Sequence, residues 1–196
     1  MNLPNKLSLG RIVMVPIIVV FSLFVNLGEA FSITMNGNVV SMQWEELIVV
    51  VLFAIASITD MLDGMIARKY NMITSFGKFI DPIADKMLVN SLMILYAYHG
   101  FIPVLAVVIM IWRDTIVDGL RMSASSRGKV VAAGMMGKIK TVLQMISLIL
   151  VMLHNLPFAF MGIAVDQIFI WLACIVSVIS GIQYFMQLKD LVMETM

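Results

Sequence analysis

Long apolar runs, separated by short polar joints, make up most of this chain. A helix needs about 20 predominantly apolar residues to cross the hydrocarbon core of a bilayer. Six segments meet this requirement, at residues 10–28, 46–67, 79–99, 101–122, 133–154 and 166–188. The pattern therefore predicts an all-α integral membrane protein with six transmembrane helices.

The joints between these segments carry residues that favour turns, among them Gly28, Gly100 and Pro157. In the first joint, Asn36-Gly37 separates two short stretches in which apolar and polar residues alternate. Asn-Gly is a preferred pair at the centre of a tight β-hairpin. We therefore expect a small β-hairpin in this loop.

The composition agrees with a membrane protein. Of the 196 residues, 61% are hydrophobic and 13% are charged, whereas a soluble domain is about half apolar. The length suggests one domain covering residues 1–196. We expect the lipid bilayer, and no nucleic acid, as its surroundings.

The basic residues predict the orientation in the membrane. With six spans, all 13 lysine and arginine residues fall on one side. The joints on the other side carry acidic residues and both histidines but no lysine or arginine. Since cytoplasmic loops are enriched in lysine and arginine, we expect both termini to be cytoplasmic, in a plasma-membrane protein.

Four carboxylates lie at the cytoplasmic ends of the second and third predicted spans. Asp60 and Asp63 are three residues apart, and Asp81 and Asp85 are four apart, so each pair shares one helix face. Ionisable groups at membrane depth are costly and usually mark function. Two helices facing each other would form a box of four carboxylates, the ligands that hard divalent cations prefer. Structural ion pairs are the alternative, but they leave the neighbouring glycine spacing unexplained.

The next two spans carry basic residues at the same depth. Arg113 and Arg121 lie on the fourth span, and Lys138 and Lys140 on the fifth. Lys140 shares a helix face with two other polar residues, whereas Lys138 points about 160° away from that face. These cations are either ordinary positive-inside residues or an anion-binding pocket. Four helices with charge at one depth should converge on a polar cavity open to the cytoplasm.

The spacing of the acidic motif resembles the signature of the CDP-alcohol phosphotransferase family at every fixed position. The segment reads Asp60-x2-Asp63-Gly64-x2-Ala67-Arg68-x8-Gly77-x3-Asp81-x3-Asp85. Within that family, residues 2–11 and 137–144 look like the corresponding segments of phosphatidylglycerophosphate synthases. One departure is Asp114, because those enzymes usually carry glutamate after the arginine at this place. Another is Asp118, which stands where an uncharged residue is common.

The resemblance implies a reaction and a set of roles. The phosphatidyl group of CDP-diacylglycerol would pass to the primary hydroxyl of glycerol 3-phosphate, with release of CMP, in a homodimer that uses two magnesium or manganese ions. The implied metal ligands are Asp60, Asp63, Asp81 and Asp85, and Asp85 would also be the catalytic base. The implied CDP-diacylglycerol residues are Gly64, Arg68, Gly77, Asp60 and Asn5. For Gly77 the alternative is that it only turns the chain before the third span. The basic residues described above are the expected glycerol 3-phosphate ligands, namely Arg113, Arg121, Lys140 and Lys138. The helix face favours Lys140, and the alternative for Lys138 is a contact with lipid headgroups.

The sequence is also compatible with other acceptors and with other classes of membrane protein. Within the family, the acceptor could be inositol phosphate, serine or phosphatidylglycerol. Aspartate-rich membrane prenyltransferases also bind a diphosphate through magnesium, but they are longer and lack the Gly-x2-Ala-Arg arrangement. A divalent-cation transporter would place carboxylates along a whole conduit, whereas here the outer half of the membrane holds almost none.

Overall fold

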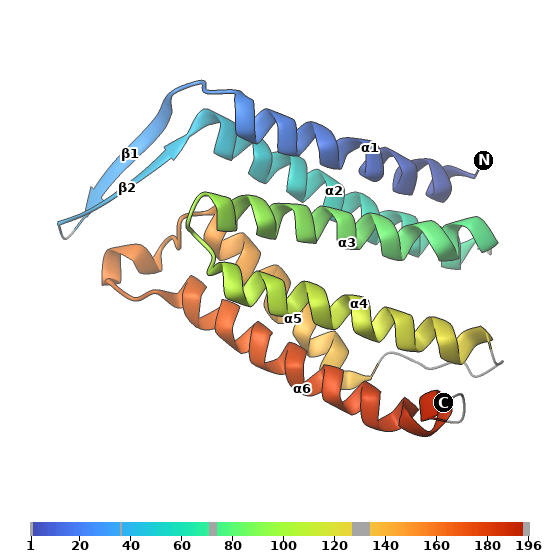
Figure 1. Ribbon diagram of the computed structural model, residues 1–196. Coiled ribbons are helices and arrows are strands. Elements are labelled where there is room, and N and C mark those ends of the chain that lie inside the picture. The colour runs from blue at the N-terminus through green and yellow to red at the C-terminus, as the bar shows by residue number, and fades with distance from the viewer. Residues whose placement is uncertain (1, 36, 71–73, 127–133, 194–196) are drawn as a thin grey trace. The chain divides into compact units, whose positions relative to one another are not determined.

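The computed structural model describes residues 2–35, 37–70, 74–126 and 134–193. Within these ranges the chain forms six α-helices, one two-stranded sheet and a short 3-10 helix, η1 (Figure 1). The elements are α1 Leu3–Phe24, β1 Glu29–Met35, β2 Asn38–Gln43, α2 Trp44–Lys69, α3 Ser75–Tyr98, α4 Val104–Ser126, α5 Met135–Met152, η1 Phe158–Met161 and α6 Val165–Met193. Each predicted span overlaps one of the six α-helices.

Two helices, α1 and α3, begin at least four residues before their predicted spans, for local reasons. α1 starts at Leu3 with a proline in its first turn, where the fixed φ of proline favours a helix start. α3 starts at Ser75, because the backbone N–H of Gly77 donates to Thr74 Oγ1 at 2.9 Å and so caps the helix. Pro82 consequently lies inside α3 and not in its first turn.

The helices support a membrane protein. Three helical segments are long and apolar enough to cross a bilayer by length and composition, namely Asn5–Phe24, Met135–Met152 and Val165–Lys189 in the described part of the chain. The helices α2, α3 and α4 have 26, 24 and 23 residues, which is also sufficient length, but they carry the ionisable residues noted above. The set of six spans and their orientation stay predictions.

The chain divides into two compact units. Unit 1 comprises Met1–Leu95 and Met152–Ile163, and unit 2 comprises Tyr96–Val151 and Ala164–Met196. The expectation of a single domain over residues 1–196 stays a prediction.

In unit 1, α1 packs along α2, and the strands β1 and β2 extend from the ends of these helices (Figure 1). The strands are antiparallel, with Ile33 opposite Val40 and Met35 opposite Asn38. Gly37 has a φ of 79°, a conformation that glycine adopts without strain. The predicted β-hairpin is confirmed, although Asn36 lies outside the described residues.

In unit 2, α4 packs along α6. Small buried residues lie on both helices, including Ala106 on α4 and Ala173 on α6, each 0% exposed. Small side chains let membrane helices approach closely. α5 joins this pair through the polar contacts described below.

Candidate active site

A stripe of three buried polar residues runs along the N-terminal half of α1. Asn5, Ser8 and Arg11 recur every three residues, and they are 7%, 0% and 1% exposed. This spacing places them along one face of the helix. We call these three residues the α1 polar stripe. Each of them makes a contact at or beside the acidic motif.

Arg11 joins the two helices that carry this motif. Its Nη1 donates to Asp60 Oδ1 on α2 and to Asp85 Oδ1 on α3, at 2.5 Å in each case. The arginine side chain is 1% exposed, whereas the two carboxylates are 40% and 49% exposed. The structure therefore brings Asp60 and Asp85 to one cationic group, and both carboxylates remain accessible.

Asp81 is held by the same helix face. Ser8 Oγ donates to Asp81 Oδ1 at 2.5 Å. The fourth predicted ligand, Asp63, is in α2, but its side chain lies outside the described residues. Among the described side chains, no three His, Cys, Asp or Glu residues form a metal-binding group. Three of the four predicted ligands thus flank α1 or contact it, and the full set of four stays a prediction.

Asn5 and Gly77, which are both expected to bind CDP-diacylglycerol, lie against each other. A Cβ at Gly77 would lie 3.0 Å from Asn5 Oδ1 and 3.2 Å from Thr74 Oγ1. Thr74 Oγ1 in turn donates to Asn5 Oδ1 at 3.0 Å. Gly77 therefore allows the α1 polar stripe to approach the start of α3 closely. Their role toward the nucleotide stays a prediction.

The other two residues expected to bind the nucleotide are Gly64 and Arg68. Both positions are in α2, and their side-chain surroundings lie outside the described residues. Their assignment to CDP-diacylglycerol also stays a prediction.

Unit 2 contains a buried ionic cluster centred on Asp114. Its Oδ1 accepts a hydrogen bond from Arg113 Nη1 at 2.9 Å, and its Oδ2 accepts one from Lys140 Nζ at 2.6 Å. The side chains of Arg113, Asp114 and Lys140 are 12%, 11% and 5% exposed. One carboxylate thus lies between two cations, one on its own helix and one on α5.

Lys140 is buried together with Gln144 and Ser147, as its predicted helix face requires. Lys138 and Arg121 are exposed. The structure thus brings Arg113 and Lys140 together, while the other two residues expected to bind glycerol 3-phosphate lie on the surface. All four roles stay predictions. Their convergence with the carboxylates does too, because these residues belong to unit 2 and the carboxylates to unit 1.

Arg113 also connects α4 to α6. Its Nε donates to the backbone oxygen of Ser177 at 3.1 Å, and its Nη2 donates to Ser180 Oγ at 2.5 Å. Its guanidinium carbon lies 5.7 Å from the centre of the Tyr184 ring, within the range of a cation–π contact. The Tyr184 hydroxyl accepts a hydrogen bond from the backbone N–H of Gly134 at 2.7 Å. This fixes the chain that enters α5.

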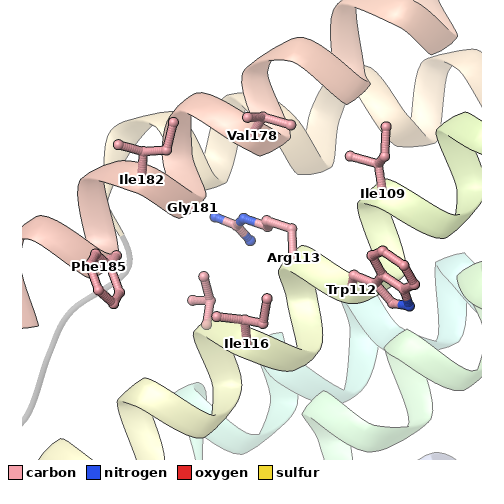
Figure 2. A pocket seen from close by; sticks show the side chains of 9 residues that line it. Ile109, Trp112, Arg113, Ile116, Val178, Gly181, Ile182 and Phe185 are labelled. Carbon is pink, nitrogen blue, oxygen red and sulfur yellow. The ribbon is translucent and has the colours of Figure 1, made fainter. Parts of the chain in front are cut away.

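A cavity of about 340 Å³ lies between α4 and α6, with Arg113 extending across it toward Gly181 (Figure 2). The other lining residues are apolar apart from the glycine: Ile109, Trp112, Ile116, Val117, Val178, Ile182 and Phe185. A Cβ at Gly181 would lie 2.9 Å from Arg113 Cγ, closer than such atoms can approach. Glycine at this position therefore lets the Arg113 side chain pack against α6 and reach Ser177 and Ser180.

Sequence reasoning assigned no site role to Ser8, Arg11, Ser180 or Gly181. For the first two there was a signal, because residues 5, 8 and 11 are polar at helical spacing before a long apolar run. For Ser180 and Gly181 there was none, since their importance depends on where Arg113 meets α6.

Comparison with known proteins agrees with the resemblance found in the motif. The model of the CDP-alcohol phosphatidyltransferase family matches residues 1–179. A protein of Bacillus subtilis (strain 168) is 39% identical over 190 residues, which cover 94% of this chain and 93% of the relative. A protein of Rickettsia felis is 33% identical over 189 residues, covering 96% of each. A protein of Salmonella choleraesuis (strain SC-B67) is 34% identical over 189 residues, covering 93% and 92%.

All three relatives are named CDP-diacylglycerol–glycerol-3-phosphate 3-phosphatidyltransferase. The range matched by the family model, residues 1–179, includes the acidic motif, the α1 polar stripe and the Asp114 cluster. The chain belongs to the CDP-alcohol phosphatidyltransferase family.

Proposed function

We propose that this protein transfers the phosphatidyl group of CDP-diacylglycerol to the primary hydroxyl of glycerol 3-phosphate, forming phosphatidylglycerophosphate and CMP. The observation that carries the proposal is that Asp60 and Asp85, from two helices, meet at one cationic group. The choice of substrates rests on relatives that carry this activity in their names and match nearly the whole chain.

A divalent metal ion goes with the family, and the residues present fit one. The donors are carboxylate oxygens, which suit magnesium and manganese. Asp60 and Asp85 already accommodate a positive charge between them. The residues that would hold two such ions are Asp60, Asp63, Asp81 and Asp85. When bound, two ions would stabilise charge on the attacking and leaving oxygens of an in-line displacement.

The transfer itself can be written in terms of bonds. The hydroxyl oxygen of the acceptor attacks the phosphorus atom that bears the diacylglycerol. The bond from this phosphorus to the CMP oxygen breaks, and the acceptor proton passes to Asp85. The Asp85 side chain is about half exposed, so a hydroxyl can reach it for general base catalysis. Gly64 and Arg68 serve the nucleotide half, where a planar guanidinium suits phosphate oxygens.

The acceptor carries a phosphate, and the Asp114 cluster has the charge to attract one. Arg113 and Lys140 share a single carboxylate, so the three residues together carry a net positive charge. Buried positive charge favours an anionic ligand. Arg121 and Lys138 are exposed, and Lys138 is the weaker candidate because it lies on another face of α5 than Lys140.

The proposal includes a setting in the cell. The chain would cross the plasma membrane six times with both termini in the cytoplasm, because all 13 basic residues then lie on that side. Glycerol 3-phosphate and CMP are soluble molecules, so an active site facing the cytoplasm can exchange both. A homodimer is the expected assembly.

The decisive experiment supplies purified protein with radiolabelled CDP-diacylglycerol, magnesium and one alcohol at a time. We expect phosphatidylglycerophosphate and CMP with glycerol 3-phosphate, and no labelled product with inositol phosphate, serine or phosphatidylglycerol. A labelled lipid formed from one of the other alcohols would reassign the acceptor. Turnover of a prenyl diphosphate in place of CDP-diacylglycerol would refute the proposal.

A further inference from the structure

The relation of Arg11 to the carboxylates differs from that of an ordinary surface arginine. Arg11 is buried within unit 1, and a single nitrogen, Nη1, reaches Asp60 Oδ1 and Asp85 Oδ1 at 2.5 Å each. This nitrogen carries two N–H groups, one for each carboxylate. Guanidinium groups stay charged at any physiological pH. A permanent cation therefore bridges α2 and α3 at the oxygens expected to bind the metal.

A divalent metal ion and Arg11 Nη1 would both be attracted to the same carboxylate oxygens, Asp60 Oδ1 and Asp85 Oδ1. Magnesium lies about 2.1 Å from a carboxylate ligand and demands near-ideal octahedral geometry. An ion at that distance from Asp60 Oδ1 or Asp85 Oδ1 would lie close to Arg11 Nη1, and the two positive charges would repel each other. Each carboxylate oxygen has a second lone pair, so both contacts can form. Binding of the ion to either oxygen would nevertheless weaken its hydrogen bond to Arg11, and Arg11 would weaken the binding of the ion.

We propose that Arg11 competes with the divalent ion for Asp60 and Asp85, and thereby weakens metal binding while it holds α2 and α3 together. The inference rests on the proposed function, because it takes these carboxylates as metal ligands. The arginine acts as a positioning residue. It prevents two carboxylates from facing each other uncompensated, at the expense of metal affinity.

The test measures metal binding, without substrates, on the full-length protein in detergent. Mn²⁺ alone is titrated into wild type, Arg11→Met and Arg11→Gln, and bound ion is followed by electron paramagnetic resonance. Both variants remove the charge, so we expect each to bind Mn²⁺ about tenfold more tightly, equivalent to about 1.4 kcal/mol. In chelator, both variants should have a lower Tm than wild type, and saturating Mn²⁺ should remove most of this difference.

Lys6→Met is the matched control, because Lys6 is an exposed cation of the same helix. It should leave both the Mn²⁺ affinity and the Tm in chelator unchanged. Adding Asp60→Asn to Arg11→Met should abolish the gain in affinity. Unchanged or weaker Mn²⁺ binding in both Arg11 variants would overturn the inference. So would a failure of both variants to fold even at saturating Mn²⁺, because Arg11 would then be a fixed structural cation.

The Mn²⁺-binding test and the test of the proposed reaction can fail independently. Tighter Mn²⁺ binding by the Arg11 variants would support the competition even if wild type formed no phosphatidylglycerophosphate. Conversely, an active wild type whose Arg11 variants bind Mn²⁺ no more tightly would retain the proposed function and refute the competition.

Discussion

Lys140 Nζ lies 2.6 Å from Asp114 Oδ2, and this ion pair links α5 to α4 inside unit 2. The two side chains are 5% and 11% exposed, so neither charge is well solvated. Lys140 therefore has a structural partner in addition to its proposed contact with the acceptor phosphate. The same carboxylate also binds Arg113, which makes Asp114 the centre of the cluster.

The first prediction concerns the stability of this cluster. Asp114→Asn would remove the carboxylate charge that Arg113 and Lys140 share. Removing one partner of a buried ion pair typically costs about 3–5 kcal/mol. We expect the Tm of the purified protein to fall markedly, measured by the thermal unfolding of detergent-solubilised samples. Lys138→Ala should leave it nearly unchanged, since Lys138 is exposed.

A double-mutant cycle separates the ion pair from other effects of these substitutions. If Asp114 and Lys140 interact directly, Asp114→Asn combined with Lys140→Met should destabilise less than the sum of the single changes, by at least about 0.5 kcal/mol. Additive effects would show that the pair contributes no stability of its own.

The second prediction concerns turnover at the acidic motif. Asp60→Asn, Asp63→Asn, Asp81→Asn and Asp85→Asn should each lose most activity, because metal binding and positioning supply most of the catalysis in phosphoryl transfer. Insertion into the membrane and purification yield should stay close to wild type. Near-normal kcat at saturating magnesium in two or more variants would contradict the assignment of two metal ions.

Much of the helical framework follows from the pattern of apolar residues. The six α-helices overlap the six predicted spans, and the hairpin lies where Asn36-Gly37 indicated it. Helix starts were less predictable, because they depend on caps. Thr74 caps the N-terminus of α3 with its side-chain oxygen. The pattern of hydrophobic residues carries no information about such a contact.

The candidate site was only partly predictable. The face of α5 that buries Lys140 follows from helical periodicity. The bridge from Arg11 to Asp60 and Asp85 spans 49 and 74 residues of sequence, so it depends on how α1 meets α2 and α3. From the sequence, Arg11 contributed to the predicted orientation and to the resemblance over residues 2–11, but it received no role in the site.

The third prediction concerns the residues proposed to bind glycerol 3-phosphate, as distinct from those proposed to bind CDP-diacylglycerol. Arg113→Ala, Arg121→Ala or Lys140→Ala should raise the KM for glycerol 3-phosphate by roughly ten- to a hundred-fold. That is the affinity lost with one charge-assisted hydrogen bond of about 1.5–3 kcal/mol. The KM for CDP-diacylglycerol should change much less.

Two further variants control this comparison. Gly64→Leu should raise the KM for CDP-diacylglycerol instead, because its side chain would fill space in the proposed nucleotide site. Lys138→Ala should raise the KM for glycerol 3-phosphate less than the three alanine substitutions above. An unchanged KM for glycerol 3-phosphate in all three alanine variants would show that the acceptor pocket lies elsewhere.

The fourth prediction tests the orientation. In a Cys174→Ala background, which removes the single native cysteine, Val39→Cys on the hairpin should react with an impermeant thiol reagent added to intact cells. Ser125→Cys, near the end of α4, should react only after lysis. Both native side chains are exposed, so access depends on the side of the membrane. The reverse labelling pattern would put the site on the wrong face for a cytoplasmic acceptor.

The last prediction concerns Gly181, where α6 leaves room for Arg113. Glycine inside a helix costs about 0.5–1 kcal/mol relative to alanine, so Gly181→Ala would normally stabilise α6. Here the new Cβ would lie 2.9 Å from Arg113 Cγ, and the arginine would have to move away from Ser180 and Asp114. We therefore expect a lower Tm and a higher KM for glycerol 3-phosphate. Gly119→Ala on α4 is the matched control, because its Cβ would meet no atom within 4 Å and should raise the Tm slightly. Equal responses of the two variants would mean that Gly181 does not position Arg113.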